Sequence, residues 1–158
     1  MTVKTILDQK GRDVFTMGPD ATLAEVAAEL TSRRIGAVLI MDGERLAGIL
    51  SERDLVRSIA SRGGACLTEA ASGIMTQKVQ TCTTDDLIEN VMERMTASRF
   101  RHMPVEDRGR VIGLISIGDV VKQRIEEAVR ERDDMRALYP FHRLRHRLSR
   151  PAADPPRQ

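Results

Sequence analysis

The sequence predicts a mixed α/β fold of the α+β class, made of two similar units that each run strand, helix, strand, strand, helix. Two observations predict it. The chain aligns with itself without a gap at an offset of 65 positions, which pairs residues 14–60 with residues 79–125. Within each copy, short β-prone stretches and helically spaced apolar residues follow in the same order. Two copies are too few for a solenoid, so the repeat indicates a pseudo-twofold pair.

The helices are expected where apolar residues recur at three- and four-residue spacing. Residues 22–34 and 86–99 show this spacing at equivalent places in the two copies. A final helix is expected to begin at Ser51 in the first copy and at Ser116 in the second. Residues 1–10 are expected to form a further helix that packs against the body of the protein.

The strands are expected in β-prone stretches bounded by turn residues. In each copy, the last two strands are joined by an Asp-Gly-Glu or Asp-Arg-Gly turn, which is typical of a hairpin. The predicted strands are residues 13–17, 36–41 and 45–50 in the first copy, and residues 78–82, 102–106 and 110–116 in the second.

The domain organisation follows from the repeat. Residues 1–62 are predicted to form the first unit with its N-terminal helix, residues 63–75 a linker, and residues 76–130 the second unit. A unit of about 60 residues buries little surface alone, so the two units should share an interface. Residues 131–158 are expected to be a basic, flexible C-terminal tail.

The tail allows two interpretations. Residues 136–158 contain six Arg and one Asp, and Arg residues separate Phe141, Leu144 and Leu148 at helical spacing. The favoured interpretation is a solvated tail, with a short helix that docks on a dimer mate. The alternative is a basic amphipathic contact to anionic lipid, nucleic acid or an acidic partner.

The composition excludes some classes of protein. Hydrophobic residues make up 41% and charged residues 30%, a balance typical of globular proteins. Aromatic residues are only 3%, so the core must be aliphatic and a stacking surface for nucleic acid is not favoured. No apolar stretch is long enough for a membrane span, and residues 1–14 lack the apolar run of a secretory signal. We therefore expect a cytoplasmic protein.

Residues with catalytic or metal-binding chemistry are few. The chain has no P-loop, Gly-x-Ser-x-Gly, Ser-x-x-Lys or dinucleotide fingerprint, so we do not expect an enzyme. His102 has no His or Cys at ligand spacing nearby, so no metal site is predicted. Cys66 and Cys82 are expected to be reduced thiols. Cys82 is either a reactive thiol or, in the favoured interpretation, a small buried residue.

Two motifs at equivalent places carry a family resemblance. Gly-Ile-Leu-Ser-Glu-Arg-Asp-Leu begins at Gly48, and Gly-Leu-Ile-Ser-Ile-Gly-Asp-Val begins at Gly113, after Arg-Phe-Arg-His-Met-Pro-Val at 99–105. With this pairing the chain resembles a tandem pair of cystathionine-β-synthase-type (CBS) domains, known as a Bateman module. The resemblance covers about residues 1–130. It implies that the units pack through their sheets and leave two clefts for adenosine-containing ligands such as AMP, ADP, ATP, NAD or S-adenosylmethionine. It also implies a homodimer that regulates a partner without catalysis.

The doubled Ser-x-x-Asp has two interpretations. As a local motif it is a variant capping box, in which Ser accepts from a backbone N–H and Asp complements the helix dipole. The same geometry suits a nucleotide, because a helix N-terminus attracts phosphate and a carboxylate accepts from both ribose hydroxyls. The resemblance assigns the ribose role to Asp54 and Asp119, with Ser51 and Ser116 near the ribose or phosphate. Both interpretations can hold together.

The two clefts are not expected to be equivalent. Arg53 is predicted to reach a phosphate, with an exposed salt bridge as the alternative, and the second copy has Gly118 in its place. Arg99, Arg101 and His102 are expected at the cleft lip. Adenine recognition is expected to be apolar with backbone hydrogen bonds. Pro104 can equally be a structural residue at a turn or strand edge.

The residues predicted to bind the ligand come from both units. They are Thr16, Gly36, Ala37, Val38, Ser51, Arg53, Asp54, Lys78, Val79, Thr81, Arg101, His102, Met103, Pro104, Ser116 and Asp119.

The expected function is therefore a regulatory CBS pair that senses an adenine nucleotide and controls an unidentified protein in trans. One alternative is a ligand-independent dimerisation scaffold, in which Ser-x-x-Asp only caps helices. Another is a nucleic-acid-associated regulator that acts through the basic tail.

Overall fold

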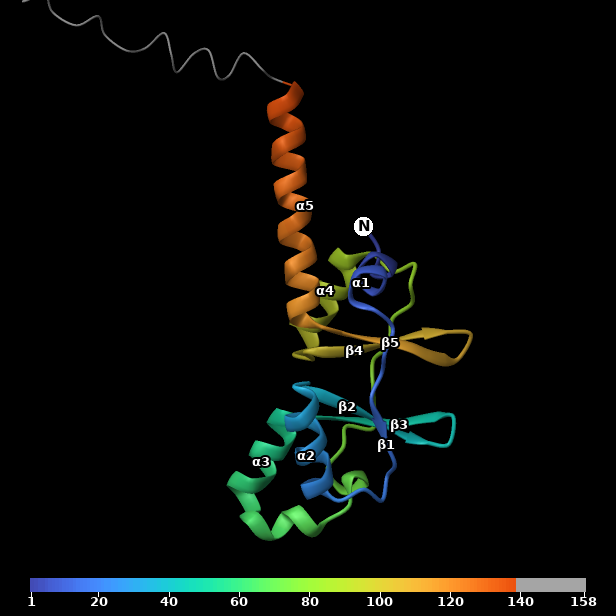
Figure 1. Cartoon of the computed structure of the whole chain (residues 1–158), viewed down its shortest axis with the longest axis vertical. Coiled ribbons are helices and arrows are strands. Elements are labelled where there is room, and N and C mark those ends of the chain that lie inside the picture. Colours follow the sequence, from blue (N-terminus) through green and yellow to red (C-terminus); the bar gives the residue numbers. More distant parts are fainter. Residues whose placement is uncertain (139–158) are drawn as a thin grey trace, which may run out of the picture. The chain divides into compact units, whose positions relative to one another are not determined.

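Figure 1 shows the computed structural model, which describes residues 1–138. The chain divides into two compact units, residues 1–121 and 122–158, and the last helix runs through the boundary. The elements in order are α1 (Val3–Lys10), β1 (Thr16–Met17), α2 (Leu23–Arg33), β2 (Ala37–Asp42), β3 (Arg45–Ser51), α3 (Glu52–Arg62), the 3-10 helices η1 (Gly64–Thr68) and η2 (Ala71–Gly73), α4 (Ile88–Ser98), β4 (His102–Asp107), β5 (Arg110–Ser116) and α5 (Ile117–Leu138).

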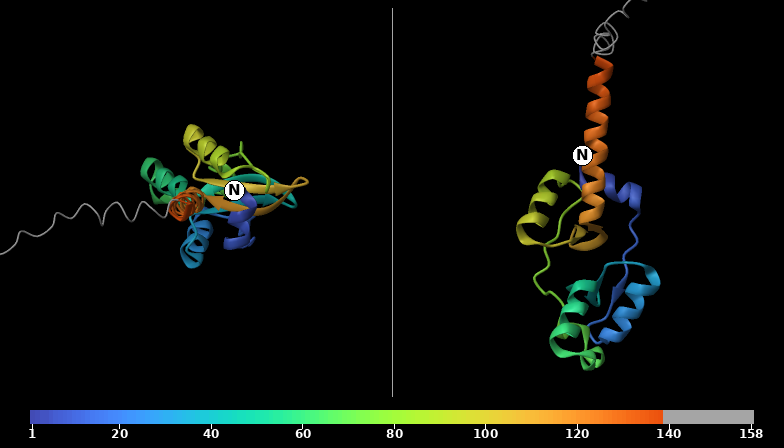
Figure 2. Two further views of the ribbon diagram at one scale, coloured as in Figure 1. Left: turned by 90° about the horizontal axis from the view of Figure 1, so that it is seen from above. Right: turned by 90° about the vertical axis from the view of Figure 1, so that its left-hand side faces the viewer.

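The predicted repeat is present within residues 1–121. β2–β3 and β4–β5 are antiparallel hairpins with matching registers, Val38 opposite Leu50 and Met103 opposite Ile115. Figure 1 shows the two hairpins facing each other, with α2 and α3 beyond one and α1 and α4 beyond the other. Figure 2 shows the same flanking helices from the side. The α+β class and the packing of the two halves through their sheets are confirmed.

The opening strand differs between the halves. β1 pairs with β2 in parallel, and Leu39 N donates to the Phe15 carbonyl. In the second half the strand expected at 78–82 shortens to one bridge, Cys82 with Val105. The position equivalent to Leu39 is Pro104, which has no N–H to donate, so the ladder cannot extend. The prediction of a full strand there was wrong for this reason.

α2 and α4 form where apolar periodicity predicted them. Leu23, Val26 and Leu30 of α2 are buried, and so are the equivalent residues of α4. Both helices end in a left-handed residue, Arg34 with φ 54° and Arg99 with φ 57°. This conformation is uncommon for a residue with a Cβ, so its occurrence at both equivalent positions underlines the repeat.

Each half is completed by a segment that precedes it or follows it in the chain. α1 packs on the second half: Val3 N donates to the Asp86 carbonyl, and Leu7 lies against Gly113. Residues 63–75 pack on the first half, where Leu23 N donates to the Glu69 carbonyl. The domain boundaries stay predictions. The buried residues of α1 belong to the core of the second half.

Besides the apolar core of each half, a further apolar cluster joins the two hairpins. Its buried members are Ala37, Leu39 and Ile49 of β2 and β3. The partly buried residues packed against them come from both halves: Val14, Leu46, Val79, Val111 and Leu114. Since these include the equivalent pairs Val14 with Val79 and Leu46 with Val111, the cluster lies around the pseudo-twofold axis.

Both cysteines lie in the interior. Cys66 and Cys82 are 2% exposed and free. Burial, with the nearby Asp86 and Glu106 carboxylates, raises the pKa of the Cys82 thiol to about 12. Almost no thiolate is therefore present near neutral pH, which favours the interpretation of Cys82 as a packing residue over a reactive one.

The remainder of α5 belongs to the second compact unit. Here Arg124 pairs with Glu127 at 2.8 Å, and Ile125, Val129 and Met135 are exposed. The helix continues to Leu138, into the segment expected to be tail. The predicted basic helix at 141–150 lies outside the described residues. In the part of the chain that is described, none of the helices combines the length and apolar character that a membrane crossing requires.

Gly48→Ala should destabilise the protein by about 1–3 kcal/mol, because an added methyl overpacks this site. A Cβ at Gly48 would lie 2.6 Å from Met75 Sδ and 2.8 Å from the Thr76 carbonyl oxygen. That carbonyl is fixed by the Ile49 N–H at 3.0 Å. Urea unfolding measures the stability of Gly48→Ala and of the control Gly18→Ala, where no atom lies within 4 Å of an added Cβ. Equal stability of the two variants would show that the contact is loose.

Candidate functional site

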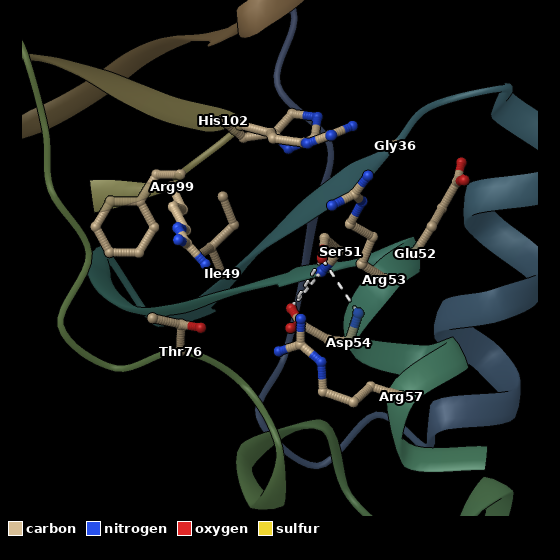
Figure 3. Close-up of a pocket in the computed structure, with 12 residues that line it drawn as sticks. Gly36, Ile49, Ser51, Glu52, Arg53, Asp54, Arg57, Thr76, Arg99 and His102 are labelled. Atoms are coloured by element: carbon tan, nitrogen blue, oxygen red, sulfur yellow. Dashed lines mark hydrogen bonds between the residues drawn. The ribbon is translucent and has the colours of Figure 1, made fainter. Parts of the chain in front are cut away.

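A cavity of about 450 Å³ lies beside the first Ser-x-x-Asp motif. Figure 3 shows that its walls come from α3 and β3 on one side and from the segment before β4 on the other. The lining residues are Gly36, Ile49, Ser51, Glu52, Arg53, Asp54, Arg57, Thr76, Arg99, Phe100, Arg101 and His102. The size is within the range of small-molecule sites, roughly 300–1,000 Å³.

Ser51 and Asp54 form the capping box expected from the sequence. Ser51 Oγ accepts from Asp54 N at 3.3 Å, and Asp54 Oδ2 accepts from Ser51 N at 2.9 Å. Ser51 Oγ also donates to Oδ2 at 3.0 Å. Glu52 N is engaged as well, by the Gly36 carbonyl at 3.0 Å. Two of the first three helical N–H groups are therefore already used, so the helix terminus alone has little left to offer a phosphate.

The Asp54 carboxylate is half-buried and faces the cavity (Figure 3). Within residues 1–138 no ion pair involves Asp54, and its capping bonds use Oδ2 only. Oδ1 therefore remains available as an acceptor. A carboxylate with a fixed backbone and a free oxygen can accept hydrogen bonds from a diol.

Four Arg residues surround the same cavity: Arg53, Arg57, Arg99 and Arg101. All four are exposed, and none forms an ion pair within the described residues. Glu52 and Asp54 are the carboxylates in the lining, so the guanidinium groups leave an excess of positive charge. Figure 3 shows the first two on α3 and Arg99 across from them. This arrangement suits an anion, and a forked guanidinium suits phosphate.

His102 lies where β4 approaches Gly36. A Cβ added to Gly36 would lie 3.1 Å from His102 Nε2, so the imidazole packs closely against this position. Burial lowers the pKa of His102, and the Lys10 and Arg101 charges lower it further, against the opposing effect of Asp119 and Glu52. The imidazole is therefore neutral at pH 7.

The second Ser-x-x-Asp motif repeats the cap and adds an ion pair. Asp119 Oδ2 accepts from Ser116 N at 2.8 Å, and Ser116 Oγ accepts from Asp119 N at 3.2 Å. Lys10 Nζ lies 2.6 Å from the same Oδ2. Burial would raise the pKa of Asp119, but the bonds from Lys10 and Ser116 outweigh it and hold the pKa below its usual value. The two motifs thus share the cap and differ in electrostatic surroundings.

The structure brings together six of the predicted site residues in the lining of the first cavity: Gly36, Ser51, Arg53, Asp54, Arg101 and His102. Others serve the packing. Ala37, Val38, Met103 and Pro104 are buried strand residues, and Val79 belongs to the cluster between the hairpins.

The remaining predicted residues lie apart from this cavity. Lys78 is exposed, and Thr81 Oγ1 donates to Glu106 Oε2 at 3.3 Å. Thr16 is exposed and lines a separate hollow with Phe15 and Arg33. Ser116 and Asp119 form the second cap described above.

Sequence reasoning missed several lining residues as site residues: Ile49, Glu52, Arg57, Thr76 and Phe100. Arg57 follows Arg53 by one helical turn, so helical spacing could have found it. Ile49 was readable from its place two residues before Ser51. Thr76 was not, because it lies outside the part of the chain that the repeat aligns.

Comparison with known proteins shows the family to which the chain belongs. The CBS domain matches residues 3–61 and 71–126, which together are most of the chain. The chain belongs to the CBS domain family. The CBS domain-containing protein CBSX3, mitochondrial, of Arabidopsis thaliana is 34% identical over 136 residues, covering 80% of this chain and 66% of that protein. The chain thus spans about two thirds of that relative's length.

Solved CBS structures have the same fold. A CBS-domain containing protein from Agrobacterium tumefaciens is 48% identical with a TM-score of 0.77, covering 78% of this chain and 99% of its own. A CBS domain protein from Pyrobaculum aerophilum, complexed with AMP, is 28% identical with a TM-score of 0.67, covering 75% and 89%. The tandem arrangement inferred from the repeat is confirmed.

The neutral His102 should make stability depend on pH. Above about pH 6.5 both the folded and unfolded states hold a neutral imidazole. Below it the unfolded chain binds a proton that the folded chain does not, so the free energy of unfolding falls by up to about 1.4 kcal/mol per pH unit until the folded pKa is passed. Urea unfolding of wild type and His102→Gln across this range measures the difference. A gap between the two that does not change with pH would contradict the lowered pKa.

Proposed function

We propose that this CBS pair binds an adenine nucleotide in the cavity beside Asp54 and thereby regulates a partner protein in trans. The observation that supports it most is the combination in one cavity of a capped carboxylate with a free oxygen and four unpaired guanidinium groups. A nucleoside monophosphate carries the complementary groups, a ribose diol and an anionic phosphate. AMP or ATP fits the proposal best, and ADP and NAD are further adenine nucleotides. S-adenosylmethionine is the alternative adenosine-containing ligand, although it has no phosphate for the arginines.

The ribose would bind at Asp54. Its Oδ1 is unused by the cap, and the capping bonds hold the carboxylate in place at no further cost on binding. Hydrogen bonds from hydroxyls to a carboxylate are about twice as strong as neutral ones. The capping interpretation and the ligand interpretation therefore describe one arrangement, in which the cap orients the acceptor.

The phosphate would bind among Arg53, Arg57, Arg99 and Arg101. The N-terminal N–H groups of α3 are mostly engaged, so the side chains must carry this contact. Because no carboxylate neutralises them within residues 1–138, they are available to an anion. The predicted role of Arg53 extends in this proposal to all four.

The adenine would lie against the apolar part of the lining. Ile49 is 9% exposed, and Phe100 is half-buried on the other wall. Gly36 leaves its backbone approachable beside them. An apolar slot with backbone groups at its edge is the usual way in which proteins hold a base.

Regulation would follow from the two origins of the lining. Ser51 to Arg57 belong to the first half and Arg99 to His102 to the second, so a nucleotide that contacts both favours one relative orientation of the halves. A homodimer that presents this change to another protein remains part of the proposal, as does the absence of catalysis. The cytoplasmic location also stays a prediction.

Two alternatives make different use of the same chain. In a ligand-independent scaffold the capping boxes would only stabilise helices, and no nucleotide would bind. In a nucleic-acid-associated regulator the basic tail would bind a polyanion, with an affinity that falls steeply with salt.

Asp54→Asn should weaken AMP binding about 10- to 100-fold, because it removes hydrogen bonds to a charged acceptor. Isothermal titration calorimetry with adenosine, AMP and ATP measures this, and thermal unfolding shows that the variant is folded. Asp85→Asn, at an exposed position outside the cavity, is the matched control and should bind as wild type.

The pattern across ligands separates the proposals. If AMP binds more tightly than adenosine and Arg53→Gln reduces that difference in affinity, the phosphate site is supported. Wild type that binds none of the three ligands would exclude the sensor and favour the scaffold. A salt-sensitive shift of DNA mobility that disappears when residues 139–158 are removed would favour the nucleic-acid regulator.

A further inference from the structure

The second Ser-x-x-Asp motif carries a contact that the first motif lacks. Lys10 Nζ donates to Asp119 Oδ2 at 2.6 Å and to the Leu114 carbonyl oxygen at 2.8 Å. Lys10 is the last residue of α1 and precedes the part of the chain that the repeat aligns. At the offset of 65 positions its counterpart in the first half is Met75, which carries no ammonium.

The pseudo-twofold relation shows which space this ammonium takes. Leu114 and Asp119 correspond to Ile49 and Asp54, and both of the latter line the 450 Å³ cavity. In the first half the Ile49 carbonyl accepts from the backbone N–H of Thr76 at 2.9 Å, and the cavity beside it remains open. In the second half the ammonium bridges the two counterparts across the equivalent space.

This bridge also changes what the carboxylate can bind. The Asp119 carboxylate is 26% exposed, and its Oδ2 already accepts from a backbone N–H and from the ammonium. Oδ1 of Asp119 has no partner in the described residues, as at Asp54, so the difference lies at Oδ2 and in the space beside it. A ribose diol that contacts both oxygens would have to displace the ammonium from a charge-assisted bond within the same chain, and such bonds are the stronger kind. Asp54 imposes no such competition, since no cation pairs with it in the described residues.

The flanking residues extend the contrast. At the offset of 65 positions, the counterparts of Arg99 and Arg57 are the cations Arg34 and Lys122. The counterparts of Arg101, His102 and Arg53, in contrast, are Gly36, Ala37 and Gly118. Those positions therefore supply no guanidinium for a phosphate. The second motif thus has a carboxylate whose Oδ2 is paired with an ammonium, and two cationic counterparts in place of the four arginines around Asp54.

We propose that Lys10 excludes nucleotide from the Asp119 cleft, so that each chain binds one nucleotide, at Asp54. This inference rests on the proposed function, because it takes a ribose–carboxylate contact as the mode of binding. Lys10 acts as a built-in competitor, and it determines the stoichiometry of the pair from a position outside both motifs.

Lys10→Met tests this on the full chain, because it keeps the aliphatic length and removes the ammonium. In calorimetry with AMP, wild type should bind one nucleotide per chain and Lys10→Met two. Adding Asp119→Asn should return the number to one, and Lys10→Met with Asp54→Asn should retain the new site alone. Lys4→Met, on the same helix and paired with Asp8 at 2.9 Å, is the control and should bind one.

The outcomes separate the two proposals. Three outcomes would overturn the role of Lys10 while nucleotide sensing stands. They are one AMP bound per chain in both wild type and Lys10→Met, two AMP bound per chain in wild type, and weaker AMP binding in Lys10→Met. No AMP in wild type, with one in Lys10→Met that Asp119→Asn removes, overturns sensing at Asp54 and supports Lys10 as the competitor. No AMP in either protein overturns both. If Lys10→Met does not fold, Lys10→Gln serves the same comparison.

Discussion

The two halves are held together by the apolar cluster between their hairpins. Neither half has enough residues to bury a full core alone. The cluster around Ala37, Leu39 and Ile49 therefore fixes the sheets against each other and uses residues of both halves. Ile49 shows the consequence most clearly, since it belongs to this cluster and also to the cavity lining. The position of the cleft is a by-product of how the core closes.

The two Ser-x-x-Asp motifs have nearly the same cap geometry and differ in the residues around them. The caps are the same to within a few tenths of an ångström in their main bonds. What differs lies around them: arginines and a histidine on one side, and a lysine from a distant helix on the other. The same backbone geometry thus occurs in two electrostatic environments. A cap is formed by its own Ser and Asp alone, whereas a ligand site also depends on the side chains around them.

Much of the fold could be predicted from the sequence. The offset of 65 positions, the helical spacing and the hairpin turns located α2, α4 and both hairpins. The second hairpin illustrates why: Arg108 and Gly109 take φ values of 52° and 78°, as a two-residue hairpin turn requires. The strand at 78–82 was mispredicted, because β-propensity does not register that the partner position is Pro104.

The site was predictable only where it follows the repeat. Ser51, Arg53 and Asp54 could be predicted from the motif, and His102 from its place at the start of the strand. The Thr76 and Lys10 contacts were not, because they come from segments that each half takes from another part of the chain. Tertiary packing places them, and no local pattern carries that information.

Because α1 packs in the core of the half that is synthesised later, its partners are absent when it leaves the ribosome. Val3, Ile6 and Leu7 are buried against α4, β4 and β5, which leave the ribosome about 100 residues later. At roughly 5–20 residues per second, these three side chains stay without their core for several seconds. The first half, whose own completing segment ends at residue 75, can close in the meantime. The half that contains α1 therefore closes last, and the buried face of α1 stays exposed until α4, β4 and β5 have been made.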